Sequence, residues 1–600
     1  MHVEITVTQF RPVKGNPAAS LDRIEESFAR FLEAGSTPDV VMYPETALTG
    51  YFLEGGVREH AVPAMTLATS LAERYAKAGG DGRPLDVVLG FYEVWGHRLY
   101  NSAMYVELGA REPRIVHVHR KVFLPTYGVF QEERFVEAGH SVRAFDTRWG
   151  RAAMLICEDL FHSISSTLAA LDGAQILLVP SASPARGAAP GEGVPANLGR
   201  WRRLAQGAAE EHGVGVAVAQ LTGFEGGKGF AGGSLVFGPR GQLLAEGPLW
   251  DEAVVTAGLD LEELTAARTD QPLLADLERA LPRLLQSRHL PPDEGGFAPD
   301  RPEAAAASED EGEWAGRPPR AGMSGAMDSS LIAIDPALVA DWLVRFLRDE
   351  MLERRGFERA VVGLSGGVDS ALTAALCARA LGPENVTGIL LPYRTSSPES
   401  AQHAMLVADS LGIATRTVDI SDAVDGYLET EEPDADPTRR GNVMARMRMI
   451  VLFDQSAKLR ALPIGTGNKS ERLLGYFTWH ADDSPPINPL GDLYKTQVWA
   501  LAGHLGLPSE VVDKPATADL IHGQTDEDDL GVSYPEADLI LHHLLNGRSP
   551  AWLVEAGFDR AKVDIVFRRL EGTHWKRNLP TVAMLSGTTI GEWYLRPVDY

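Results

Sequence analysis

Short apolar runs alternate with amphipathic segments over the first part of the chain. Runs of strand length lie at 3–8, 40–43, 87–91, 152–156, 176–179 and 214–219. Apolar residues return at helical spacing over 20–33 and 64–78. Strands that alternate with helices are typical of α/β folds. The pattern therefore predicts an α/β domain over residues 1–262.

The same alternation resumes after a break in composition. Residues 293–320 are rich in proline, alanine, glycine and acidic side chains, which bury too little apolar surface to order a chain. A helix is predicted over 336–352, and a strand begins at Val361. Further strands are predicted at 386–391, 415–420 and 462–465. We expect a partly disordered linker over 263–335 and a second α/β domain over 336–600.

Composition narrows the possible functions. The chain has 56 Lys and Arg against 82 Asp and Glu, a net charge of −26, which argues against nucleic-acid binding through a basic surface. No apolar run approaches the length of a membrane span, and MHVEITVTQF predicts a strand rather than a signal peptide. The two cysteines fit a reducing compartment. We expect a cytoplasmic protein that acts on small molecules.

The sequence LSGGVDS at 364–370 carries the strongest chemical signal. It lies between a predicted strand and a helical pattern, and such a turn lets backbone N–H groups approach phosphate at a helix N-terminus. Gly366 and Gly367 permit close approach. Ser365 and Ser370 supply hydroxyl groups, and Asp369 can hold a metal ion on the phosphate. An ordinary strand-to-helix turn is the alternative. The motif lacks the Walker A lysine and resembles the PP-loop of ATP pyrophosphatases, which adenylate a substrate and release pyrophosphate.

Three residues of the first region suit amide hydrolysis. Glu45 follows one predicted strand in VVMYPETALTGY, Cys157 follows another in MLICEDL, and Lys121 lies in HRKVFLPTYGVFQEERF. A thiol can attack, a carboxylate can move the proton, and an ammonium can stabilise the oxyanion. Each residue alone fits a structural role, as Cys377 does within a predicted helix.

These motifs resemble the nitrilase superfamily, whose amidases carry a Glu-Lys-Cys triad on an αββα sandwich. The resemblance implies that Glu45 is the base, Lys121 the oxyanion partner and Cys157 the nucleophile, with Glu132 as a second glutamate. It also implies a glutamine pocket formed by Tyr127, Ser183 and a following arginine. Arg200 is our candidate, and Arg186 and Arg202 are alternatives because 185–197 resembles an insertion.

Several motifs of the second region carry polar groups suited to phosphates. GTGNKSERLLGYFTWH at 465–480 contains Glu471, which could share Mg²⁺ with Asp369 because hard oxygen ligands suit that ion. GDLYKTQ supplies Lys495 as a second cation. In NVMARMRM, Arg446 and Arg448 are two positions apart, so they cannot face the same side of a helix.

In their order and spacing, SGGVDS, GTGNKSE, DLYKTQ, QTDEDDLG and the later WKR resemble the NAD synthetase family over 336–600. This implies a PP-loop domain with a parallel sheet, of the adenine nucleotide alpha hydrolase type. Implied ATP contacts are Gly363, Leu364, Ser365, Gly366, Gly367, Val368, Asp369, Ser370, Thr466, Lys495 and Thr517. Implied contacts to deamido-NAD are Asn442, Arg446, Glu471, Tyr476, Phe477, Thr478, Trp479, Asp482 and Lys576, and the implied Mg²⁺ ligands are Asp369 and Glu471.

A nitrilase-like region on such a synthetase marks the glutamine-dependent form. The resemblance implies ATP-dependent amidation of deamido-NAD, ammonia passed between two sites, and at least a homodimer through the synthetase domain. The family's GDG segment reads HADDSPPIN here: Asp482 aligns with the usual aspartate, but Pro486 replaces a second acid. Nicotinate mononucleotide is therefore an alternative acceptor.

Other functions fit the residues less well. GMP synthetase would need a Cys-His-Glu glutaminase, and asparagine synthetase would need an N-terminal cysteine where this chain has His2. A catalytically inactive nucleotide sensor is a further alternative. It is disfavoured because the triad and the Asp369 and Glu471 carboxylates are all present.

Overall fold

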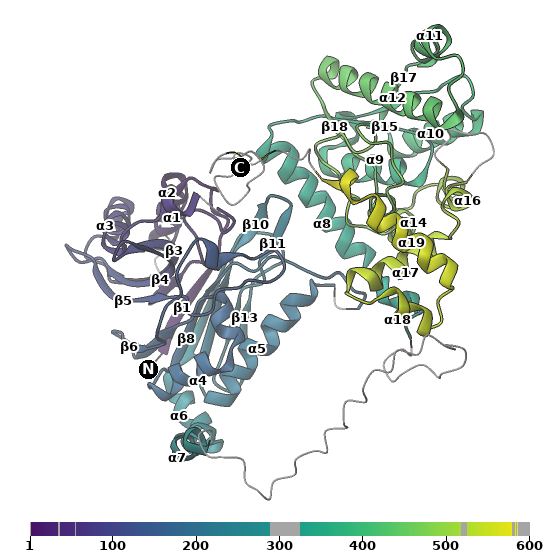
Figure 1. Cartoon of the computed structure of the whole chain (residues 1–600). Coiled ribbons are helices and arrows are strands. Elements are labelled where there is room, and N and C mark those ends of the chain that lie inside the picture. The colour runs from purple at the N-terminus through teal and green to yellow at the C-terminus, as the bar shows by residue number, and fades with distance from the viewer. Residues whose placement is uncertain are drawn as a thin grey trace, which may run out of the picture. The chain divides into compact units, whose positions relative to one another are not determined.

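The computed structural model describes residues 2–33, 37–53, 56–191, 193–287, 325–517, 525–578, 583 and 585, in two compact units. One unit contains most of residues 2–287, and the other contains 187–195 and the described residues from 325 onward (Figure 1). The proline- and acid-rich segment 293–320 lies outside the described residues.

Two six-stranded sheets form the centre of the first unit, in the orders β14-β1-β2-β3-β4-β5 and β13-β12-β9-β8-β7-β6. The strands are β1 (His2–Gln9), β2 (Val40–Met42), β3 (Leu85–Trp95), β4 (Arg98–Leu108), β5 (Arg114–Arg120), β6 (Ala144–Asp146), β7 (Arg151–Met154), β8 (Ile176–Ser181), β9 (Gly215–Gln220), β12 (Leu235–Phe237), β13 (Leu243–Glu246) and β14 (Ala253–Asp260). A separate hairpin pairs β10 (Thr222–Glu225) with β11 (Lys228–Ala231).

Helices cover the outer faces of both sheets, which gives four layers. They are α1 (Pro17–Glu33), α2 (Val57–His60), α3 (Ala64–Tyr75), α4 (Ser163–Leu171), α5 (Ala196–His212), α6 (Leu261–Asp270) and α7 (Leu273–Ser287). Phe28 of α1 and Leu71 of α3 pack with Val41 and Phe91 of the first sheet. Trp201 of α5 is fully buried, and α5 packs against β9 of the second sheet. The unit is the αββα sandwich that the sequence predicts.

A four-stranded parallel sheet, in the order β17-β16-β15-β18, organises the second unit. Its strands are β15 (Ala360–Gly363), β16 (Val386–Leu390), β17 (Ala414–Thr417) and β18 (Leu462–Ile464). Its helices are α8 (Pro336–Arg348), α9 (Val368–Leu381), α10 (Pro398–Leu411), α11 (Ser421–Glu431), α12 (Pro437–Leu459), α13 (Lys469–Leu474), α14 (Lys495–His504), α15 (Ser509–Val512), α16 (Asp526–Leu530), α17 (Tyr534–Leu545), α18 (Pro550–Glu555) and α19 (Arg560–Gly572).

Helices cover this sheet as in other α/β folds: α9 and α12 both pack on β15. The strand predicted over 415–420 ends at Thr417, and the chain then turns into α11, where the Ser421 N–H donates a hydrogen bond to Asp419 (2.7 Å). Cys377 lies inside α9, where burial raises the pKa of its thiol to about 12. This agrees with its predicted structural role.

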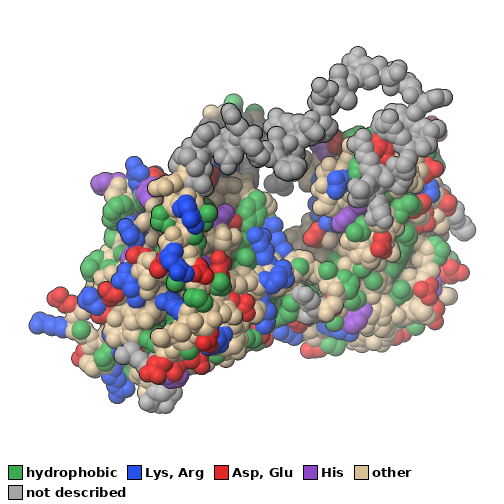
Figure 2. All heavy atoms as spheres, turned by 90° about the horizontal axis from the view of Figure 1, so that it is seen from below, with side chains coloured by type: hydrophobic (Ala, Val, Ile, Leu, Met, Phe, Trp, Pro, Cys, Tyr) green, Lys and Arg blue, Asp and Glu red, His purple; other side chains and the backbone are tan. Residues whose placement is uncertain are grey.

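The C-terminal helices form a second cluster around Tyr534, Leu541 and Leu553, into which Leu474 of α13 packs. Helix α13, which carries Glu471, is therefore held by these helices, α17 and α19 among them. None of the described helices has the length and apolarity needed to cross a bilayer. Acidic and basic side chains are interspersed on the face of each unit seen in Figure 2.

Candidate active sites

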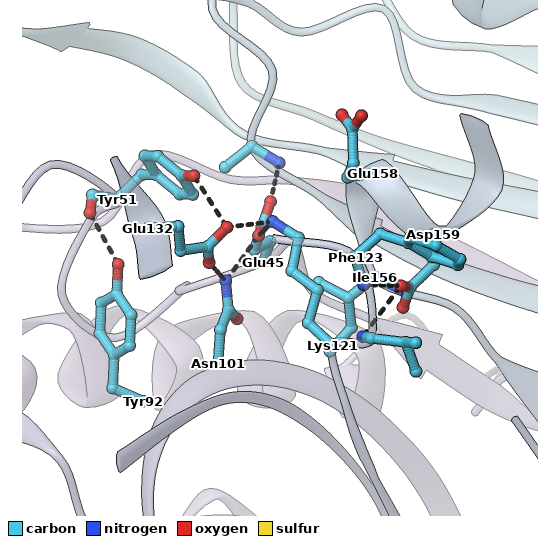
Figure 3. Close-up of polar contacts among 12 residues, drawn as sticks. Glu45, Tyr51, Tyr92, Asn101, Lys121, Phe123, Glu132, Ile156, Glu158 and Asp159 are labelled. Atoms are coloured by element: carbon cyan, nitrogen blue, oxygen red, sulfur yellow. Dashed lines mark hydrogen bonds and ion pairs between the residues drawn. The ribbon is translucent and has the colours of Figure 1, made fainter. Parts of the chain in front are cut away.

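A buried cluster of charged side chains forms where β2 and β5 of the first sheet end. The Lys121 Nζ lies 2.8 Å from Glu45 Oε1 and 2.7 Å from Glu132 Oε2, and all three side chains are almost wholly buried. Asn101 on β4 donates to both carboxylates, 2.7 Å from Glu45 (Figure 3). The Ala182 N–H donates to the second oxygen of Glu45 (2.8 Å). Three of the predicted catalytic residues thus meet at one point.

Burial sets the protonation of this cluster. It raises the pKa of the Glu45 carboxyl although Lys121 opposes the shift, and a raised pKa makes the carboxylate a stronger base. Burial alone would lower the pKa of Lys121, but the Glu132 and Glu45 carboxylates hold it well above its usual value. Lys121 therefore stays a cation.

Cys157 directly follows the turn after β7 and adopts a left-handed backbone conformation with φ of 46°. A non-glycine residue in this region costs on the order of 1–3 kcal/mol and is common at functional sites. Burial and the Glu45 carboxylate raise the pKa of the Cys157 thiol, while Lys121 lowers it. The thiol is therefore neutral at rest and lies within the electrostatic influence of the predicted base and cation.

Of the residues predicted to bind glutamine, Tyr127 lies close enough to Cys157 for the two side chains to interact electrostatically. The Tyr127 hydroxyl donates to Glu158 Oε2 (2.7 Å), and Ser183 Oγ accepts from Asn197 Nδ2 (3.2 Å). Burial and the bond to Glu158 raise the pKa of Tyr127 to about 12, and the Arg200 guanidinium, which lies 4.3 Å from the centre of the Phe161 ring, opposes this shift.

The two alternative arginines lie in different places. Arg186 stacks over Phe130 (5.5 Å), on the segment that carries Tyr127, whereas Arg202 pairs with Glu246 on β13. The surroundings therefore favour Arg200 or Arg186 over Arg202.

Sequence reasoning missed Asn101, Tyr51 and Glu158. The Tyr51 hydroxyl donates to Glu132 Oε2 (3.1 Å). Tyr51 lies six residues after Glu45 in the same motif, and Glu158 is adjacent to Cys157, so proximity in sequence could have indicated both. Asn101 has no such signal.

In the second unit, the turn 364–367 links β15 to the start of α9 at Val368, as predicted. Gly366 has φ of +77°, and a Cβ there would lie 2.2 Å from the Ser400 carbonyl oxygen, so only glycine fits. The Ser365 and Ser370 hydroxyl oxygens lie 3.1 Å apart, and Ser370 also donates to the Gly367 carbonyl (3.0 Å). These bonds hold the loop in a fixed shape at the N-terminus of α9.

Lys495, at the start of α14, joins the carboxylates predicted to bind metal. Its Nζ makes a short ion pair with Asp369 and lies 3.4 Å from Glu471 Oε1. Asn468 Nδ2 donates to Asp369 (2.8 Å), and the Asn468 N–H donates to Glu471 (3.2 Å). Burial and the nearby Asp369 raise the pKa of Glu471 to about 8. Thr466 lies in the turn between β18 and α13, and Thr517 directly precedes 518–524, which are not described.

The predicted acceptor residues gather around the segment 475–482. The Thr478 hydroxyl donates to Asn442 (3.2 Å), its N–H donates to Asp482 (2.9 Å), and Arg446 donates to the Trp479 carbonyl (3.2 Å). Lys576 donates to the Gly475 and Phe477 carbonyls (3.0 and 3.1 Å).

Tyr476 and Glu471 have partners outside this group. Tyr476 donates to Asp529 (2.9 Å), and Glu471 lies with the carboxylates at Lys495. Arg448 turns away from Arg446 toward the Leu391 carbonyl (3.2 Å), as the two-residue spacing predicts.

Comparison with known proteins agrees with both halves of this description. Residues 4–269 match the family model described as carbon-nitrogen hydrolase, and residues 339–580 match the one described as NAD synthase. The chain is 49% identical over 262 residues to the NH(3)-dependent NAD(+) synthetase of Trichlorobacter lovleyi, which covers 44% of this chain and 95% of that protein. It is 45% identical over 244 residues to the corresponding protein of Fusobacterium nucleatum, which covers 40% of this chain and 94% of that one.

Two solved structures are similar over nearly the whole chain. The glutamine-dependent NAD+ synthetase from Acinetobacter baumannii superposes with a TM-score of 0.65 at 22% identity, covering 96% of this chain and 94% of that one. The glutamine-dependent NAD(+) synthetase from Cytophaga hutchinsonii superposes with a TM-score of 0.67 at 18% identity, covering 96% of this chain and 93% of that one. At such identities they establish the fold alone.

The fold and the two sites define an amide-forming ligase with a carbon-nitrogen hydrolase domain fused to a PP-loop domain. Both predicted folds are confirmed. The chain belongs to the NAD synthase family.

Proposed function

We propose that the protein converts deamido-NAD to NAD, with glutamine as the nitrogen donor and ATP as the activating substrate. The supporting observation is that one chain holds two different charged clusters. One places Glu45 and Lys121 beside a thiol, and the other places Lys495 and two carboxylates beside a PP-loop. The first set suits amide hydrolysis, and the second suits reaction at a nucleotide phosphate.

At the first site, the Cys157 sulfur attacks the glutamine carboxamide while Glu45 takes the thiol proton. The Lys121 ammonium lies where the oxyanion develops. Glu45 returns the proton to the departing nitrogen, ammonia leaves, and water hydrolyses the thioester to glutamate. The raised pKa of Glu45 supports both proton transfers.

At the second site, the nicotinate carboxylate attacks the α-phosphorus of ATP and pyrophosphate leaves. Asp369 and Glu471 would hold Mg²⁺ with the phosphate oxygens, because carboxylate oxygens are the donors that this ion prefers, and a bound cation would relieve the repulsion from Asp369 that helps to raise the pKa of Glu471. When bound, the ion neutralises phosphate charge. Lys495 contributes a fixed cation between the same carboxylates.

Ammonia then attacks the acyl-adenylate, giving the carboxamide and AMP. Ammonia released into neutral water would be protonated and lose its nucleophilicity. We therefore propose that it reaches the second site without release to solvent, which raises its effective concentration.

A turnover assay with the full chain tests the function. With glutamine and ATP, we expect AMP and the amidated product to form in equal amounts from deamido-NAD. The segment with Pro486 in place of an acid supports a second candidate acceptor, nicotinate mononucleotide. If kcat/KM is higher with nicotinate mononucleotide, that compound is the acceptor instead of deamido-NAD. If no AMP forms with either acceptor, the proposal is contradicted.

The affinity for Mg²⁺-ATP should increase with pH up to about 8. Because the pKa of Glu471 is raised to about 8, the carboxylate must lose a proton before it can bind the ion. Calorimetric titrations between about pH 7 and 9 should show up to roughly tenfold tighter binding per pH unit on the acid side. Glu471→Gln should bind more weakly and lose most of this dependence. A wild-type affinity that is independent of pH would exclude Glu471 as a ligand.

Charge reversal at Arg446 should weaken binding of the acceptor more than binding of ATP. The Arg446 guanidinium reaches the segment 475–482 and could pair with the anionic acceptor. Arg446→Glu should raise the KM for deamido-NAD by roughly tenfold or more, as expected for a lost charged hydrogen bond. Arg439→Glu on the same helix α12, where Arg439 pairs with exposed Glu432, is the matched control. Equal effects of the two variants would place Arg446 outside the site.

We propose at least a homodimer through the synthetase domain. Ile450 and Phe453 on α12 expose 62% and 41% of their surfaces, which supports an interface there. Light scattering of the full chain should give at least twice the monomer mass, and Ile450→Glu should shift it toward the monomer. A monomer that is active at nanomolar concentration would contradict the proposal.

A further inference from the structure

Besides Glu132, the first unit contains another buried carboxylate near the triad, that of Asp159, which the mechanism above does not use. We infer that Asp159 is a positioning residue of the glutaminase site, which holds the Cys157 turn in register with the Lys121 segment. This inference rests on the proposed glutaminase function. Asp159 has no exposed surface, and its partner His119 is 2% exposed.

Asp159 accepts four hydrogen bonds from two separate parts of the chain. Its Oδ1 accepts from the N–H groups of Val122 and Phe123, both at 3.0 Å. Its Oδ2 accepts from the Ile156 N–H at 3.0 Å and lies 2.8 Å from His119 Nε2 (Figure 3 draws the backbone bonds). The carboxylate therefore joins the residues just after Lys121 to the residue just before Cys157.

This link matters because the two segments end strands of different sheets. Lys121 follows β5 of the first sheet and Cys157 follows β7 of the second, so no shared β-ladder sets one against the other. The backbone at Cys157 is also strained, with φ of 46°, and needs fixed surroundings to persist. The bonds of Asp159 to both segments supply that constraint.

The pKa of Asp159 agrees with an ionised carboxylate that accepts hydrogen bonds at both oxygens. Burial alone would raise the pKa of Asp159, but the bonds from His119 and from the backbone N–H groups hold it below the usual value. Asparagine has the same shape but only one acceptor oxygen. In Asp159→Asn the amide nitrogen must therefore face N–H donors on one of the two segments.

Asp159→Asn in the full chain is the first test. The kcat for glutamine hydrolysis should fall by at least about 100-fold with little change in KM, as expected when a reacting group moves by an ångström. NAD synthesis from ammonia should not change. Asp86→Asn is the matched control: Asp86 is equally buried (1% exposed) and binds Tyr105 and Arg148 away from the triad. A kcat within threefold of wild type, or an equal loss in Asp86→Asn, would overturn the inference.

His119 provides a milder pair of variants in case Asp159→Asn misfolds. His119→Gln keeps an N–H donor for Asp159 and should retain most of the glutaminase rate. His119→Leu removes that donor and should lower kcat by roughly tenfold, since one buried acceptor loses a bond. Equal rates in the two variants would contradict the inference.

The alkylation rate of Cys157 by chloroacetamide, followed by peptide mass analysis, separates this inference from the proposed function. In Asp159→Asn the thiol should react more slowly and with a higher pH midpoint, because Lys121 no longer lies close to the thiolate. A merely stabilising role would leave this midpoint unchanged, and that result would overturn the inference. If the wild-type chain does not hydrolyse glutamine, the proposed function fails, but this comparison still tests the positioning of Cys157.

Discussion

The Cys157→Ala variant will make NAD from ammonia at the wild-type rate and will make none from glutamine. Only the first site needs a sulfur nucleophile, and alanine removes the one thiol that lies near Glu45 and Lys121 in the described structure. The second cluster, in the other unit, is untouched by the change. NAD formation is measured with glutamine and, separately, with ammonium chloride.

Cys377→Ala is the control for Cys157→Ala, because Cys377 is the other cysteine and lies buried in α9. It should retain both activities. If Cys157→Ala also lost synthesis from ammonia, the assignment of the two half-reactions to separate sites would be wrong.

The Lys495→Met variant should lose synthesis from both nitrogen donors by roughly 10²–10³-fold, the usual effect of removing one preorganised charge from a reacting group. Lys495 pairs with Asp369 and Glu471, so its loss removes the fixed cation nearest the PP-loop carboxylates. Glutamine hydrolysis should continue, because its residues lie in the other unit. The rate of AMP release measures the synthetase reaction, and the rate of glutamate release measures glutamine hydrolysis.

Lys469→Met controls for the loss of a nearby lysine. Lys469 begins α13 and pairs with Asp492, whose side chain is 96% exposed, so its removal should change AMP release little. Circular dichroism and thermal melting check that Lys495→Met is folded, since removal of a buried ammonium leaves two carboxylates unpaired. Near-normal AMP release by a folded Lys495→Met would exclude Lys495 from the reaction.

The residues that sequence could predict lie next to recognisable local patterns. Glu45, Lys121 and Cys157 each follow a strand, and Asp369 lies in the first turn of the helix that follows a glycine-rich turn. Their chemistry depends on residue type and local spacing, and both can be read from a short stretch of chain. The αββα and PP-loop folds followed from the same motifs.

Other contacts could not be predicted because they join distant segments without a local signature. Asn101 lies within β4 and bridges Glu45 to Glu132, 56 and 31 residues away. Asp159 is two residues after the nucleophile, but its bonds to Val122 and Phe123 depend on how two sheets pack. The strands β4 and β5 also escaped prediction, since Asn101 and Ser102 interrupt the apolar run of β4, and β5 carries arginine and histidine among its apolar residues.

Transfer of nitrogen from glutamine to the acceptor is the central claim, and isotope tracing tests it most directly. The full chain is supplied with ATP, deamido-NAD and glutamine labelled with ¹⁵N in its carboxamide, in the presence of excess unlabelled ammonium. We expect the carboxamide of the NAD formed to carry ¹⁵N well above its share of the total ammonia pool, because the released ammonia is delivered without mixing with solvent. NAD labelled only in proportion to the bulk pool, or no NAD at all, would contradict the account.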